Sequence, residues 1–127
     1  MTSAPLFGIA LAPLYVAIAQ VESCNGVTSP NVYQITRCYL DDLGRVYGVH
    51  FEDQCATDRA ASEMAMQFYW KHYGHRYLSI TGKLPDYEVL ARIHNGGPDG
   101  WRKKSTLGYW RKVKAELDRN TKKGAGK

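Results

Sequence analysis

The sequence predicts one mostly α-helical domain with at most one or two short strands. Its 127 residues suit one ordinary domain and are too few for two. Hydrophobic residues make up 44% of the chain and aromatic residues 12%, which is enough to build a core. Five segments repeat apolar residues at intervals of three and four, the spacing of one helix face.

The first 21 residues contain no charged side chain. A membrane span needs about 20 apolar residues, and this run is shorter and interrupted by proline, so we expect no transmembrane segment. A signal peptide is disfavoured because a charged first region is missing. Pro13 suits the first turn of a helix, in which Leu14 and Ile18 share a face and which leads into Glu22.

The next segments are short. Residues 23–31 are dense in turn formers and predict a surface loop. Residues 32–35 predict a brief strand or an extended entry. Thr36 is a candidate N-cap of a helix that runs through Leu43 and stops at Gly44.

The longest helical pattern runs from about Gln54 to Tyr73, with Gly74 as its predicted end. We expect it to be the central helix. Another helix opens at Pro85 and ends at the Asn-Gly-Gly-Pro run of residues 95–98.

The last helix begins after a cap at Ser105 or Thr106 and ends near Asn120. We therefore expect a catalytic or binding domain over residues 1–120 and a flexible basic tail over residues 121–127.

The charge of the chain is concentrated at its C-terminal end. Residues 99–127 carry ten Lys or Arg against three Asp or Glu, with Trp101 and Trp110 among them. Such a segment suits a polyanion, which could be nucleic acid, an anionic membrane surface or an acidic cell-wall polymer. A basic domain that binds cell-wall polymer or nucleic acid without cutting it is therefore one alternative function, and a basic end that only keeps the protein soluble is another reading.

The cysteines and histidines do not predict a metal site. Cys24, Cys38 and Cys55 are too few for a disulfide-dense miniprotein and lack zinc-finger spacing, while one disulfide plus a free thiol is left open. His72 and His75 have no cysteine or carboxylate in register, which favours surface histidines. We expect no cofactor.

Glu22 is the first charged residue of the chain and follows Ile18 and Val21 at the end of an apolar helix. A carboxyl group against such a surface is poorly solvated, which favours the protonated form that a general acid requires. The competing interpretation is an ordinary exposed glutamate at a helix end.

A glycine-rich segment at residues 92–100 forms the second candidate site. Its three glycines around a proline allow the backbone to approach a ligand closely. Asn95 offers both a donor and an acceptor, which suits sugar hydroxyl and N-acetyl groups. A simple helix end explains the glycines equally well, and the spacing is not that of a phosphate-binding loop.

Four motifs in this order resemble the lysozyme-like superfamily and are most similar to invertebrate-type lysozymes. They are AQVES at 19–23, YQI at 33–35, ARIHNGGP at 91–98 and TLGYW at 106–110. The pattern also resembles goose-type lysozymes and soluble lytic transglycosylases. The similarity extends from about Leu14 to Leu117.

The resemblance implies a lysozyme-like helical domain with a substrate cleft that cleaves the β-1,4 bond between N-acetylmuramic acid and N-acetylglucosamine in peptidoglycan. Chito-oligosaccharides are a further candidate substrate. We expect a monomer that acts at the cell wall and has no nucleic-acid partner. Glu22 takes the position of the catalytic acid, and the implied substrate-binding residues are Tyr33, Gln34, His94, Asn95 and Tyr109.

The chain also departs from these families. Invertebrate-type lysozymes are rich in disulfides, whereas this chain has three cysteines. They carry a second catalytic aspartate before the YQI motif, but residues 23–32 contain no acid. Asp42 matches another aspartate of the family, although a helix-surface or capping role is expected for it.

Without a second carboxylate, two routes remain for the reaction. An N-acetyl or 6-hydroxyl group of the substrate could attack, which gives substrate-assisted hydrolysis or the 1,6-anhydro product of a lytic transglycosylase. Alternatively, polar groups such as Thr28, Ser29 or Asn95 could position a water. The sequence thus predicts a muramidase with Glu22 as general acid, with a lytic transglycosylase as the alternative.

Overall fold

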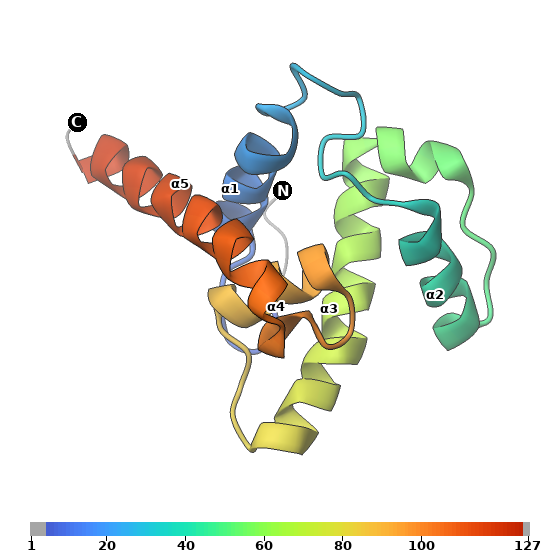
Figure 1. Ribbon diagram of the computed structural model, residues 1–127. Helices are drawn as coiled ribbons and strands as arrows, with labels where there is room; N and C mark the ends of the chain where they lie inside the picture. The colour runs from blue at the N-terminus through green and yellow to red at the C-terminus, as the bar shows by residue number, and fades with distance from the viewer. Residues whose placement is uncertain (1–4, 126–127) are drawn as a thin grey trace.

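The structure is a computed structural model that describes residues 5–125, and within this range it is almost entirely helical (Figure 1). Its only β-type pairing there is an isolated bridge between Leu6 and Ile9. The mostly α fold class is therefore confirmed. The helices are α1 (Ala12–Ser23), α2 (Arg37–Tyr47), α3 (Arg59–Thr81), α4 (Tyr87–Gly96) and α5 (Leu107–Ala125), with short 3₁₀ turns η1 (Asp53–Thr57), η2 (Gly100–Arg102) and η3 (Lys104–Thr106).

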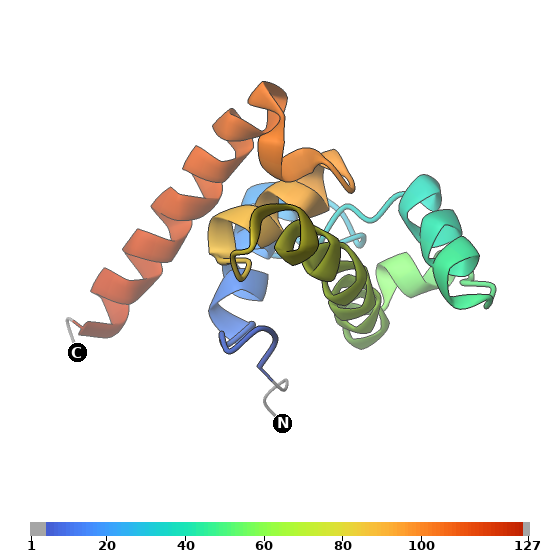
Figure 2. The same cartoon turned by 90° about the horizontal axis from the view of Figure 1, so that it is seen from below.

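Helices α1 and α4 lie at the centre of the molecule, with α5 on one side and α3 and α2 on the other (Figures 1 and 2). Leu14 and Ile18 of α1 are fully buried. Trp70 of α3 is also fully buried, and its indole N–H donates to the carbonyl oxygen of Leu90 in α4 at 2.8 Å. This packing holds the C-terminal end of α1 next to that of α4.

The predicted helix starts agree with the structure in four cases, one of which is α5, which begins at Leu107 directly after Thr106. Pro13 occupies the first turn of α1, and the Thr36 hydroxyl caps α2 by accepting from the Tyr39 N–H at 3.2 Å. Asp86, directly after Pro85, caps α4. The start predicted near Gln54 is wrong for α3, because those residues form η1 and the α-helix begins after the Asp58 cap.

The helix ends predicted at Gly44 and Gly74 are wrong, and α5 continues past its predicted end near Asn120 to Ala125. Helix α2 continues past Gly44 to a cap at Gly48, and α3 continues past Gly74 to a cap at Gly82. Both interior glycines serve close packing instead. A Cβ at Gly74 would lie 2.4 Å from the ring of Phe7, and one at Gly44 would lie 2.8 Å from a backbone oxygen.

Residues 32–35, for which a brief strand or an extended entry is predicted, do not form a strand. The Asn31 side chain takes both backbone hydrogen bonds of Ile35: its amide donates to the Ile35 oxygen at 2.7 Å, and its oxygen accepts from the Ile35 N–H at 2.8 Å. Gln34 between them has a φ of 53°, in the left-handed region. The segment is therefore a tight turn that side chains hold in place.

The end of the chain stays partly untested. Helix α5 is helical as far as Ala125, and residues 126–127 lie outside the described residues. The flexible tail over residues 121–127 and the domain boundary at 120 stay predictions. Across the described part of the chain, none of the helices combines the length and apolarity of a membrane span.

Candidate active site

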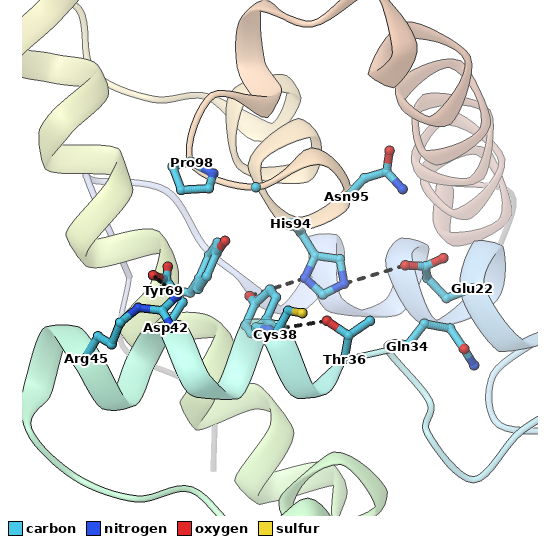
Figure 3. Close-up of a pocket in the computed structure, with 12 residues that line it drawn as sticks. Glu22, Gln34, Thr36, Cys38, Asp42, Arg45, Tyr69, His94, Asn95 and Pro98 are labelled. Atoms are coloured by element: carbon cyan, nitrogen blue, oxygen red, sulfur yellow. Dashed lines mark hydrogen bonds and ion pairs between the residues drawn. The ribbon is translucent and has the colours of Figure 1, made fainter.

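A cleft of about 580 Å³ opens where the end of α1, the turn before α2, α2 itself, α3 and the end of α4 meet. Figure 3 shows the side chains that line it. Four of the lining residues come from segments that are far apart in the sequence. They are Glu22, Gln34, Tyr69 and His94.

Glu22 is the penultimate residue of α1, and its side chain points into the cleft with 17% of its surface exposed (Figure 3). Its Oε2 lies 3.6 Å from Nε2 of His94. Within residues 5–125, no lysine or arginine nitrogen lies within 4 Å of this carboxylate. The nearest charged or titratable nitrogen is therefore that of an imidazole.

Ser23, the next residue, fixes the loop that follows α1. Its buried hydroxyl donates to the carbonyl oxygen of Val32 at 2.7 Å and accepts from the Gly26 N–H at 2.9 Å. The loop therefore folds back on the helix end, and the turn before α2 lies beside Glu22.

The hydrogen bonds of His94 select one tautomer of its neutral ring. Nε2 lies 2.8 Å from the carbonyl oxygen of Tyr33, which can only accept, so Nε2 carries the proton. Nδ1 then accepts from the Tyr39 hydroxyl at 3.3 Å. The side chain is 1% exposed, so this buried ring presents an N–H to the Tyr33 carbonyl and, at longer range, to Glu22.

The Tyr109 hydroxyl approaches Glu22 from α5. It is buried and has no hydrogen-bond partner among the described residues. Burial raises the pKa of Tyr109 well above its ordinary value, and the negative charge of Glu22 raises it further. The phenol therefore keeps its proton, and its O–H can donate to Glu22.

The Tyr33 side chain does not reach the cleft, which corrects the expectation that it binds substrate. It is 1% exposed, and its hydroxyl donates to the carboxylate of Glu63. The left-handed turn at Gln34 reverses the chain, so the ring of Tyr33 enters the core. Only its carbonyl oxygen belongs to the site, as the acceptor of His94.

Gln34 and Asn95 do line the cleft, one on each side of Glu22 (Figure 3). Gln34 is exposed, and its amide donates to the Asn31 carbonyl at 2.9 Å. Asn95 is exposed in the last turn of α4. Their roles in substrate binding, like those of His94 and Tyr109, stay predictions.

Asp42 also lines the cleft, and its helix-surface or capping role stays a prediction. Its carboxylate accepts from the Tyr73 hydroxyl and pairs with Arg45 at 3.1 Å. Four residues of this segment share one spacing, and that spacing could have revealed their common face. Thr36, Tyr39, Asp42 and Arg45 recur every three residues, and all four line the cleft.

The cysteines are free thiols, and Cys38 lies in the cleft wall. Among the described residues, no three His, Cys, Asp or Glu side chains come together as metal ligands.

No protein-family model matches the sequence. Invertebrate-type lysozyme 3 of Caenorhabditis elegans is 34% identical over 101 residues, which cover 72% of this chain and 71% of that protein. The chain belongs to the invertebrate-type lysozymes. Lysozyme 1 of Crassostrea virginica is 40% identical over 66% of this chain, and a lysozyme of Magallana gigas is 41% identical over 64%.

The chain spans 42% and 55% of the length of these two oyster lysozymes. Among solved structures, a chain in the crystal structure of Aeromonas hydrophila PliI in complex with Meretrix lusoria lysozyme has a TM-score of 0.63 and 26% identity. The match covers 87% of this chain and 92% of that one. The resemblance inferred from the four motifs to the invertebrate-type lysozymes is thus confirmed.

Proposed function

We propose that this chain cleaves the β-1,4 bond between N-acetylmuramic acid and N-acetylglucosamine in peptidoglycan, with Glu22 as the general acid. One observation carries the proposal: the Glu22 carboxyl group is 17% exposed and points into an open cleft of about 580 Å³. The membership of the chain in the invertebrate-type lysozymes supports it.

The neighbours of Glu22 suit proton donation. A general acid gives its proton to the glycosidic oxygen and becomes a carboxylate as the bond breaks. Two donors, His94 Nε2–H and the Tyr109 hydroxyl, lie close to the Glu22 carboxyl group. They would stabilise the charge that forms on Glu22 during the reaction.

In place of a second carboxylate, the substrate itself is proposed to supply the group that attacks the sugar carbon. A retaining glycosidase holds its two carboxyl groups about 5–5.5 Å apart. Figure 3 places Asp42 and Glu22 at opposite ends of the cleft with His94 between them, and Asp42 is occupied by Tyr73 and Arg45. The N-acetyl or 6-hydroxyl group of the sugar would then attack.

Product analysis separates the two outcomes of such an attack. Hydrolysis leaves reducing ends, whereas attack by the 6-hydroxyl group gives 1,6-anhydro ends that are lighter by one water. Mass spectrometry of digested muropeptides distinguishes a muramidase from a lytic transglycosylase. Chito-oligosaccharides, which share the β-1,4 linkage, would be a second substrate to digest.

The general acid is tested with Glu22→Gln, which keeps the shape of the side chain but removes the proton donor. We expect wall-clearing activity to fall by at least about 100-fold, the usual contribution of a general acid, without a change in Tm. Glu52→Gln makes the same charge change at an exposed side chain and should keep activity.

Wall clearing by Glu22→Gln at the rate of the unmodified chain would refute the enzymatic proposal. A basic helical domain that binds wall polymer without cutting it would then be the remaining function. Exposed bases on α5, including Arg111, Lys112 and Lys114, would supply that affinity.

A further inference from the structure

A second pocket, of about 460 Å³, lies on α3 where it faces the C-terminal end of α2. We call it the basic pocket. None of the residues that line it is acidic. They are Tyr47, Lys71, His72, His75, Arg76 and Ser79.

The charge of the basic pocket is not cancelled by its neighbours. Lys71 is exposed and has no carboxylate within 4 Å in the described part of the chain. Arg76 binds Asp99 at 2.7 Å, but Arg102 binds the same oxygen at 2.7 Å. Hydrogen bonds from Arg102 and Arg76 hold the pKa of Asp99 below its ordinary value, and two guanidinium groups against one carboxylate leave a positive charge.

Side chains in the wall of the basic pocket contact one another and the backbone. Tyr47 donates its hydroxyl to the Phe68 carbonyl at 3.0 Å, which fixes α2 on α3. The ring of His72 packs edge-on against Tyr47 at 6.3 Å and against Tyr73 at 4.7 Å. Aromatic walls with a free ammonium group at the rim suit a ligand that combines a carbon skeleton with an anionic group.

Two contacts place the basic pocket next to the cleft. Arg76 lines the pocket and donates to the carbonyl oxygen of Pro98, which lines the cleft. His72 packs on Tyr73, whose hydroxyl binds Asp42 in the cleft. A polymer that leaves the cleft at its Asp42 end can therefore reach the basic pocket.

We propose that the basic pocket binds a carboxylate carried by the glycan strand that occupies the cleft. This inference rests on the proposed function, because peptidoglycan carries such carboxylates, on its peptides or on N-acetylmuramic acid where no peptide is attached, and a chitin chain carries none. The pocket then makes the chain prefer peptidoglycan over a neutral polymer with the same backbone linkage.

The test compares how the unmodified chain and Lys71→Glu bind to insoluble polymers, measured by co-sedimentation on ice. Three polymers are compared: peptidoglycan freed of teichoic acid, the same peptidoglycan with its carboxylates converted to neutral amides, and chitin. Because an exposed charge contributes modestly, Lys71→Glu should raise the Kd for untreated peptidoglycan roughly 3- to 10-fold and the Kd for chitin less than about 2-fold. Amidation of the peptidoglycan should weaken binding of the unmodified chain by a similar factor. Lys71→Arg keeps the positive charge and should bind untreated peptidoglycan as the unmodified chain does.

Lys83→Glu is the matched control, since it makes the same charge change at an exposed lysine outside the pocket. Equal shifts for Lys83→Glu and Lys71→Glu would show that only net charge matters and would overturn the inference. An unchanged Kd after amidation would overturn it as well. If the chain binds but releases no muropeptides, the proposed cleavage fails, while the Kd values still decide on the pocket.

Discussion

Asn95 shows how the site separates activity from stability at the level of one residue. Its amide is exposed at the end of α4 and lines the cleft near Glu22. Asn95→Ala should lower kcat/KM on peptidoglycan roughly 10-fold, the value of one lost hydrogen bond of about 1.4 kcal/mol. Its Tm should change little, because few packing contacts are lost.

Parallel measurements of turnover and thermal unfolding check this expectation. If Tm falls as much as turnover does, Asn95 is a structural residue that ends α4, and its cleft position has no role in substrate binding.

The sequence could predict residues whose role depends on chemistry and position along a motif. Glu22, Gln34 and Asn95 were found in this way, and all three line the cleft. It could not predict where the Tyr33 ring points, because that direction depends on the left-handed backbone at Gln34. Asp42 was assigned to the helix surface because its partner, Tyr73, comes from a distant helix.

At the level of elements, the contact between α4 and η2 depends on a glycine. A Cβ at Gly100 would lie 1.9 Å from the backbone oxygen of Arg92, and a backbone atom cannot move aside as a flexible side chain can. Gly100→Ala should therefore lower the free energy of unfolding by about 3 kcal/mol.

Gly108→Ala is the matched change in α5, where a Cβ meets nothing within 4 Å. It should raise the free energy of unfolding by up to about 1 kcal/mol, because alanine favours a helix over glycine. Urea unfolding measures both variants. Similar effects of the two substitutions would mean that the contact with Arg92 does not control stability.

Helix starts were easier to predict than helix ends. Proline and capping side chains act locally, so Pro13 and Thr36 marked their helices correctly. Glycine has two uses that look alike in a sequence: it ends a helix, or it lets another segment approach. Gly44 and Gly74 have the second use, which is revealed only by the approach of the Val49 backbone to Gly44 and of the Phe7 ring to Gly74.

At the level of the whole molecule, buried tyrosines should make the fold sensitive to alkali. Burial, together with the charge of Glu63, raises the pKa of Tyr15 to about 12, and burial also raises the pKa of Tyr39, Tyr69 and Tyr109. In the unfolded chain these groups ionise near pH 10. Stability is therefore fully present below pH 10 and is lost as pH rises toward 12.

Tyr15→Phe tests this dependence because phenylalanine does not ionise. Each such tyrosine adds at most about 1.4 kcal/mol per pH unit to the slope of stability against pH. The slope between pH 10 and 12, measured by denaturant unfolding at each pH, should be shallower in the variant. Identical slopes would show that Tyr15 does not contribute to alkaline unfolding.

The pairing of α1 with α5 joins residues from the two ends of the chain. Gln20, two residues before Glu22, exchanges two amide hydrogen bonds with Asn120, 100 positions away. During synthesis on a ribosome, the helix that carries Glu22 emerges before α2, α3 and α4, but its partner emerges after them. The nascent chain therefore cannot complete the packing of the helix that carries Glu22 until α5 has left the exit tunnel.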